Sequence, residues 1–532
     1  MIKTGDKTQS LTIQSAWIMC AKFISFGISF LLPLLTVRYL TQTEYGTYRQ
    51  VFLVVMNCVA ILPLGFSMSA YYYLSREPEK RVSVISNILL FNFVLGGLAC
   101  GLLFIYPQLL GSLFQNTELT RLAPKIGVVI WFWIFSTFLE TVALANHETK
   151  LATGFIIAAQ FTKTLLMVGA VLIFGTVDAF VYAAIVQGFL QTCVLLAYLS
   201  SRFPGFWSKF EPSFFVEQTF YAIPFGLAGL LFIAQSDIHN YFVGHHFGEE
   251  QFAVYAVGCF QLPLIAMLYE SFGSVLIPRM SELQSTGNKR EMVLTTVGVM
   301  QKLALIYLPT FAFLMVVADV FITTLFTPRF AASVPIFRVN LLIIPVYCLI
   351  IDPLGRAFKE LGGFLLKVRA LLFIGLVAAL WLGVRHLELH QVIGIVVAVI
   401  YLETAISMVK IVSMLEIGRK DVRLLGKFGK TAFGAGAAGI ALYFFYKTGK
   451  DYLLNFTLRL SHDILSVVHL ERAADFIGGT LFLGICFLLF AALYLLLVNK
   501  LGVFDHSQKE RVFKFIRRLR RQPRPSIALE AD

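Results

Sequence analysis

Among the ionisable side chains inside long apolar stretches of this 532-residue sequence, nine are candidate functional residues, because a charge there calls for an explanation. An ionised group near the middle of a lipid bilayer costs on the order of several kcal/mol unless it is paired or faces water. Five of the nine are basic, and four are acidic. They are Lys22, Lys163, Lys302, Arg338 and Lys410, and Glu140, Asp237, Glu270 and Glu403.

Both sets consist of residue types suited to binding charged species. Lysine and arginine attract phosphate groups and donate hydrogen bonds to their oxygens. The basic set therefore predicts substrate-binding residues for an anion, with Lys22 and Lys302 as the leading candidates. The acidic set predicts ion-coupling sites, above all Glu140 and Asp237. The alternative is that the lysines and carboxylates neutralise one another as braces between helices, and both interpretations stay open for each residue.

The apolar stretches that carry these charges predict an all-α polytopic membrane protein. Hydrophobic residues make up 58% of the chain and charged residues only 14%, with a mean hydropathy of +0.77. Soluble domains carry about 25% charged residues. A run of about 20 apolar residues crosses a hydrocarbon core of roughly 30 Å. We expect fourteen spans, near residues 11–38, 50–75, 82–106, 121–145, 151–175, 178–200, 214–243, 253–278, 297–325, 334–353, 364–384, 390–414, 428–446 and 474–499.

The lysines and arginines also predict the orientation of the chain, because they concentrate in cytoplasmic loops. With both termini in the cytoplasm, 29 of the 44 lysines and arginines lie on the cytoplasmic side and ten on the outer side. The first apolar run has no cleavage site and is expected to remain as a span. An amphipathic, basic pattern over residues 506–524 predicts a helix lying on anionic lipid.

Two segments six spans apart are alike, which indicates an internal repeat. Arg38–Tyr48 aligns with His245–Tyr255 at a constant offset of 207, and both segments end in tyrosine. An even number of intervening spans predicts parallel repeats about an axis along the membrane normal. We therefore expect two pseudo-symmetric six-helix lobes at 1–210 and 211–418, two further helices with an outer amphipathic segment at 419–500, and a basic cytoplasmic tail at 501–532.

Four short motifs then resemble a known family. They are Leu40–Tyr48, Pro224-Phe-Gly226, Pro278–Ser281 and Leu325–Phe330. Together they resemble the polysaccharide transporters, including O-antigen flippases, of the multidrug/oligosaccharidyl-lipid/polysaccharide exporter superfamily. One departure is Thr327-Pro328, where this family often has glycine.

The resemblance implies a flippase of a bacterial inner membrane. Its substrate would be an undecaprenyl-diphosphate-linked oligosaccharide, such as a lipopolysaccharide repeat unit, moved from the cytoplasmic to the outer leaflet by alternating access. The implied partners are this substrate, membrane lipids and polysaccharide assembly proteins, with no nucleic acid. No cofactor is implied.

Other classes of function are less well supported by the sequence. A membrane-embedded polymerase or glycosyltransferase would need catalytic motifs on an aqueous loop, and we find no Asp-x-Asp there, no phosphate-binding Gly-x4-Gly-Lys and no His-Glu-x-x-His. The seven cysteines have no metal-ligand spacing. We therefore expect neither an enzyme nor a metal site. An ion-coupled drug or cation antiporter of the same superfamily remains the alternative, although it predicts twelve spans and a less basic interior.

Overall fold

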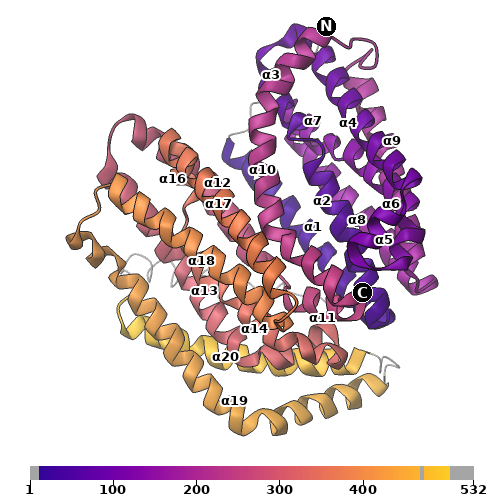
Figure 1. The fold of residues 1–532 in the computed structure, drawn as a ribbon. Helices are drawn as coiled ribbons and strands as arrows, with labels where there is room; N and C mark the ends of the chain where they lie inside the picture. The colour runs from indigo at the N-terminus through magenta and orange to yellow at the C-terminus, as the bar shows by residue number, and fades with distance from the viewer. Residues whose placement is uncertain (1–10, 468–472, 504–532) are drawn as a thin grey trace, which may run out of the picture. The chain divides into compact units, whose positions relative to one another are not determined.

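The computed structural model describes residues 11–467 and 473–503, and every regular element in these ranges is a helix (Figure 1). In chain order the elements are α1 (Leu11–Tyr39), α2 (Gln42–Ile61), η1 (Phe66–Met68), α3 (Ser69–Arg76), η2 (Pro78–Lys80), α4 (Arg81–Ile105), α5 (Gln108–Phe114), α6 (Thr117–Ser136), α7 (Phe138–Ala145), α8 (Thr149–Ile173), α9 (Val177–Arg202), α10 (Pro212–His246), α11 (Gly248–Gly258), α12 (Pro263–Ser285), α13 (Lys289–Phe326), η3 (Pro328–Ser333), α14 (Val334–Leu341), α15 (Ile343–Val346), α16 (Asp352–Ala357), α17 (Lys359–Gly383), α18 (Leu389–Met414), η4 (Arg419–Leu425), α19 (Gly426–Val467) and α20 (Ala474–Lys500).

The described chain forms two compact units. Unit 1 comprises the described residues up to 281, together with 318–343 and 351–411. Unit 2 comprises 282–317, 344–350 and the described residues from 412 onward. Unit 1 thus holds residues from both predicted lobes. The division at 210 and 418 remains a prediction from the repeat in the sequence.

Helix α6 shows how the apolar pattern builds the core of unit 1. Ile126, Ile130 and Ile134 recur every fourth residue, so they lie on one face of the helix, and all three are fully buried. The helix packs against α4, α9 and α2. Helix α1 packs against α8 in the same unit. Lys22 on α1 and Lys163 on α8 therefore lie on two helices that pack against each other.

Two spans in unit 1 are bent at corresponding places. The pair α2 and η1–α3 bends by 47°, and the pair α11 and α12 bends by 53°. Pro63 lies in the first break and Pro263 begins the helix after the second. Proline cannot donate the backbone hydrogen bond that would continue the preceding helix. In the predicted division of the chain, these are the second span of each lobe.

A glycine on α10 fits against the first of these bends. Leu64 and Gly65 both have positive φ, 46° and 69°, in the break after α2. A Cβ added to Gly226 would lie 2.0 Å from the carbonyl oxygen of Leu64, far inside the contact distance between a Cβ and a backbone oxygen. The Pro224-Phe-Gly226 motif therefore contains the one residue type that lets α10 lie against the bend.

Unit 2 is built from the first part of α13 with α19 and α20. Helices α19 and α20 pack along each other, and the Tyr494 hydroxyl on α20 donates to the carbonyl of Leu305 on α13, 3.0 Å away. At the beginning of α13, Lys289 pairs with Glu416 and Arg290 pairs with Asp421. The hydrogen bond from Lys289 lowers the pKa of Glu416, and the hydrogen bond from Arg290 lowers that of Asp421. Helix α13 has non-helical φ and ψ at Val317, where the chain passes from unit 2 to unit 1.

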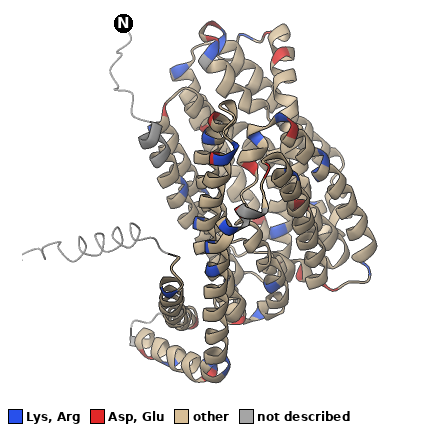
Figure 2. Cartoon of the chain, turned by 90° about the vertical axis from the view of Figure 1, so that its left-hand side faces the viewer, with Lys and Arg blue, Asp and Glu red and all other residues tan. Residues whose placement is uncertain are grey.

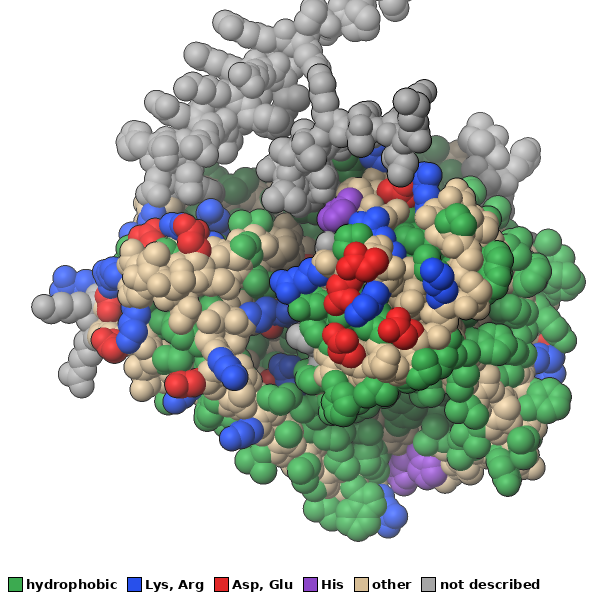
Figure 3. Space-filling view, turned by 90° about the horizontal axis from the view of Figure 1, so that it is seen from above, with side chains coloured by type: hydrophobic (Ala, Val, Ile, Leu, Met, Phe, Trp, Pro, Cys, Tyr) green, Lys and Arg blue, Asp and Glu red, His purple; other side chains and the backbone are tan. Residues whose placement is uncertain are grey.

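Eleven described helices are long and apolar enough to cross a membrane, and thirteen are when each bent pair counts as one span. These correspond to thirteen of the fourteen predicted spans. The remaining one, 428–446, lies in the helix α19 but is not among these candidates. In Figure 3, charged side chains gather at the end of the helices that faces the viewer, and hydrophobic side chains predominate toward the right and the bottom of the view. The predicted amphipathic helix at 506–524 lies outside the described residues.

Candidate functional site

The first candidate site is a set of three charged residues around Lys22, which unit 1 brings together from distant parts of the chain. The Lys22 ammonium on α1 lies 3.9 Å from a carboxylate oxygen of Glu270 on α12. Glu140, on α7, is near enough to Lys22 to interact with it electrostatically. The side chains of Lys22 and Glu270 are 54% and 69% exposed. Ion pairs this exposed contribute roughly 0–1 kcal/mol, so Lys22 remains available to another anion.

Glu403 lies in a different environment, enclosed by hydrogen-bond donors from two other helices. Arg369 on α17 donates from Nε to one carboxylate oxygen at 3.0 Å, and its Nη2 forms an ion pair with the same oxygen at 2.9 Å. Gln235 on α10 donates to the other oxygen at 2.7 Å. The Glu403 side chain is only 16% exposed. These contacts connect α10, α17 and α18, and the guanidinium of Arg369 neutralises the Glu403 carboxylate.

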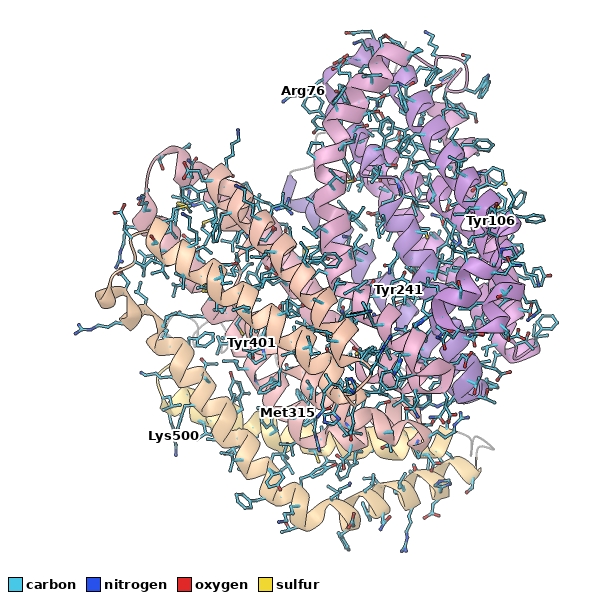
Figure 4. All side chains as sticks on the ribbon, viewed as in Figure 1. Arg76, Tyr106, Tyr241, Met315, Tyr401 and Lys500 are labelled. Carbon is cyan, nitrogen blue, oxygen red and sulfur yellow. The ribbon has the colours of Figure 1, made fainter. Side chains whose placement is uncertain are left out.

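Asp237 belongs to a third polar cluster, between α10 and α2. Its carboxylate is half-buried and accepts hydrogen bonds from Asn240, at 3.4 Å, and from Asn57, and it interacts electrostatically with Arg49. Asn57 also donates to the hydroxyl of Tyr241, 3.0 Å away. The ring of Tyr241, labelled in Figure 4, stacks on Phe114 with centroids 5.5 Å apart. The Asp237 carboxylate thus accepts hydrogen bonds from two asparagines and interacts with one arginine.

The other predicted basic residues do not join these clusters. Lys163 on α8 lies over the ring of Trp133, 4.3 Å from its centroid, and Lys410 on α18 lies 5.6 Å from that of Phe364. A cation over an aromatic face is stabilised by the ring quadrupole. Lys302 and Arg338 are exposed, and neither has an ion pair within 4 Å among the described residues. Lys302 lies in unit 2, whereas the others lie in unit 1.

Two arginines that are not among the nine candidate residues from the sequence are part of these clusters. Arg369 lies within α17 and Arg49 within α2, so both are helical. Arg369 falls inside the apolar run predicted at 364–384, and a carboxylate inside a predicted span, such as Glu403, favours a cationic partner. These two signals together would have identified it. Figure 2 shows that acidic and basic residues occur along the helices as well as at their ends.

Outside these charged clusters, two observations bear on other chemistry. Among residues 11–467 and 473–503, no group of three or more histidines, cysteines, aspartates or glutamates could hold a metal ion. Unit 2 also contains an open apolar groove of about 310 Å³ between α13 and α19. Met315, labelled in Figure 4, is one of the residues that line it.

Solved structures of transporters share this arrangement of helices. An inward closed conformation of the lipid II flippase MurJ matches with a TM-score of 0.65 at 12% identity, covering 94% of this chain and 99% of that one. An inward-facing multidrug resistance MATE family transporter of the MOP superfamily matches with a TM-score of 0.57 at 16% identity, covering 75% and 99%. A MOP superfamily transporter from Pyrococcus furiosus matches at 0.54 and 15%, covering 76% and 96%.

At these identities the likeness establishes the fold alone, and it confirms the predicted all-α transporter architecture. No curated protein sequence matches the chain. A family model described as "Polysaccharide biosynthesis protein" matches residues 34–335, which is more than half of the chain and includes all four motifs noted in the sequence. This multi-pass membrane protein therefore belongs to the polysaccharide biosynthesis protein family and has the fold of MOP superfamily transporters.

Proposed function

We propose that this protein is a flippase that moves a lipid-diphosphate-linked oligosaccharide from the cytoplasmic to the outer leaflet of a bacterial inner membrane by alternating access. The observation that carries the proposal is Lys22, an exposed cation on a membrane-spanning helix that forms a weak ion pair with Glu270. A diphosphate carries about two negative charges, and a fixed cation lowers the barrier to moving them through a region of low dielectric constant.

The comparisons support the same proposal from a different direction. The matching family is named for polysaccharide biosynthesis, and one similar structure is named as a flippase of lipid II. Neither name specifies the sugar or the direction of transport. The undecaprenyl carrier, the O-antigen class of repeat unit and the cytoplasmic location of both termini are parts of the proposal that rest on the sequence.

The test is a flipping assay with purified full-length protein in lipid vesicles. A fluorescent polyprenyl-diphosphate oligosaccharide is placed in both leaflets, and dithionite added outside bleaches the outer leaflet. We expect the protein to make the inner-leaflet fluorescence accessible, and a phosphate-free analogue of the lipid to move at least 10-fold more slowly. Equal rates for both lipids would contradict a role for fixed cations in recognition.

A cation antiporter is the second candidate, because Glu270 and Glu140 place two carboxylates beside Lys22 and one similar structure is named as a multidrug transporter. Uptake of a cationic dye that depends on a proton or sodium gradient, with no flipping of the diphosphate lipid, would support this function instead. If flipping itself depends on an ion gradient, we expect Glu140 or Asp237 to carry the ion. Full gradient dependence in the Glu140→Gln, Asp237→Asn double variant would exclude both.

A further inference from the structure

Two arginines exchange hydrogen bonds between the ends of α1 and α13. Arg38, in the last turn of α1, donates from Nη1 to the carbonyl of Leu325 and from Nη2 to that of Thr324, both at 2.9 Å. These carbonyls belong to the last turn of α13. In return Arg329, which follows α13, donates from Nη2 to the carbonyl of Val37 at 2.8 Å. Each arginine thus caps the other helix.

The electrostatics of helix ends explains why these contacts need cations. The last four carbonyls of a helix lack partners within the helix, and the aligned peptide dipoles place about half a negative charge there. Two such ends repel each other when they meet. Arg38 and Arg329 supply the positive charge and the hydrogen-bond donors that allow α1 and α13 to end side by side.

Short-range packing holds this junction in register. Thr41 and Glu44 form a capping box at the beginning of α2, which fixes the tight connection after Arg38. Gln42 then donates to the carbonyl of Arg329, 2.8 Å away. The fully buried ring of Phe330 meets Tyr45 edge to face, with centroids 5.6 Å apart. The same segments that carry the sequence motifs therefore form the junction.

Helix α2 also meets α11 closely beside this junction. A Cβ on Gly46 would lie 1.9 Å from the carbonyl oxygen of Glu249, so the two helices are in direct contact. The aligned segments Arg38–Tyr48 and His245–Tyr255 consequently pack on each other. In a transporter with alternating access, one end of the path must be closed while the other is open.

We propose that Arg38 and Arg329 form a latch that closes the transport path at the end where α1 and α13 terminate, and that it must break in every cycle. Hydrogen bonds to carbonyls suit this role, because water replaces them easily once the ends separate. The non-helical backbone at Val317 lies between the latched end of α13 and the rest of the helix, where a hinge would be needed. The inference rests on alternating access as part of the proposed function.

The latch can be tested by accessibility without any substrate. Ser274 is exposed on α12 one turn after Glu270, so Ser274→Cys reports on the region around Lys22. A membrane-impermeant methanethiosulfonate is applied to either side of sealed vesicles of known orientation, and labelling of the chain without this substitution is subtracted. We expect labelling almost entirely from the side opposite the latch.

Breaking the latch should reverse this preference. In the Arg38→Ala, Arg329→Ala double variant we expect labelling of Cys at position 274 from the latch side to rise at least 10-fold. Arg121→Ala is the matched control, because Arg121 is an arginine in unit 1 that pairs with Glu118 and Asp178 and caps no other helix end among the described residues. If a folded double variant is still labelled from the same side as before, the proposal is overturned, and the two arginines only cap the helix ends.

A second measurement tests the latch even if the Arg38→Ala, Arg329→Ala double variant does not fold. Gln42→Cys and Arg329→Cys place thiols at a contact of the latch, and a short bismaleimide should join them. Because Arg329→Cys removes one arginine of the latch, labelling from the latch side should rise before crosslinking. Crosslinking should then abolish this labelling and flipping alike, whereas continued flipping by the crosslinked protein would refute the latch. A protein whose sidedness responds as expected but which never moves the diphosphate lipid would retain the latch and refute the flippase.

Discussion

The sharpest prediction concerns Lys22, for which substrate binding and helix bracing forecast different results. In the brace hypothesis the Lys22 to Glu270 pair stabilises the fold. At 3.9 Å its Coulomb energy is about 1 kcal/mol in water and about 4 kcal/mol at an effective dielectric constant of 20. Because both side chains are more than half exposed, solvent screening brings the expected contribution down to roughly 0–1 kcal/mol.

A substrate-binding role predicts a much larger effect on transport. A hydrogen bond to a charged group contributes about 1.5–3 kcal/mol, and each 1.4 kcal/mol corresponds to about tenfold in rate or affinity. We therefore expect Lys22→Gln to slow flipping of the diphosphate lipid by about 10-fold to 100-fold. The free energy of unfolding of this variant, measured by heating in detergent, should fall by no more than about 1 kcal/mol. Lys22→Arg, which keeps the charge, should retain most of the flipping activity.

The same variants can refute this reasoning. If Lys22 is only a brace, Lys22→Gln leaves the rate of flipping unchanged and lowers stability by no more than about 1 kcal/mol. The additional Glu270→Gln substitution then restores that stability. Normal flipping by a well-folded Lys22→Gln, Lys302→Gln double variant would remove both residues from the substrate site. Because Lys302 lies in unit 2 without an ion pair among the described residues, its single variant shows whether Lys22 acts alone.

Three further predictions follow from the packing and the ion pairs. Gly226→Ala should lower stability by more than about 1 kcal/mol, because its Cβ would lie 2.0 Å from a carbonyl oxygen, whereas Gly229→Ala on the same helix, with open space around it, should not. Glu403→Gln should lower the free energy of unfolding by about 1.5–3 kcal/mol, as measured by thermal unfolding. The Glu403→Met, Arg369→Met double variant should regain most of this loss, because it leaves no unpaired charge. The pKa values of Glu416 and Asp421 are lower in the folded protein than the values of about 4 expected in the unfolded chain. The ion pairs of these two carboxylates therefore stabilise the fold above about pH 4, and this stabilisation is lost as the pH falls through the folded pKa values. Hydrogen exchange in residues 415–425 should rise accordingly below pH 4, and Glu416→Gln with Asp421→Asn should abolish this dependence.

Local properties made several parts of this protein predictable. The length of an apolar run indicates a membrane span, so thirteen of the predicted spans correspond to described helices that could cross a membrane. Proline removes a backbone donor, and Pro63 and Pro263 lie at the breaks of the two bent spans. The family resemblance rested on short motifs, and the match over residues 34–335 confirmed it.

The partners of the intramembrane charges were not predictable in this way. Helical spacing indicates which residues share a face of one helix, but it does not indicate which face of another helix lies opposite. Glu403 aligned with Ser407 and Lys410 along α18, yet it pairs with Arg369 on α17 and Gln235 on α10. Lys410 instead lies over Phe364.

The sequence by itself thus determined that this chain spans a membrane many times, that it carries charges within those spans and which family it resembles. Each of these properties depends on the composition and order of neighbouring residues. The tertiary structure alone decided that Lys22 meets Glu270, that Glu403 has a resident arginine and that Arg38 caps the end of α13. Those contacts join residues far apart in the chain, and they depend on how each helix is rotated and packed against its neighbours.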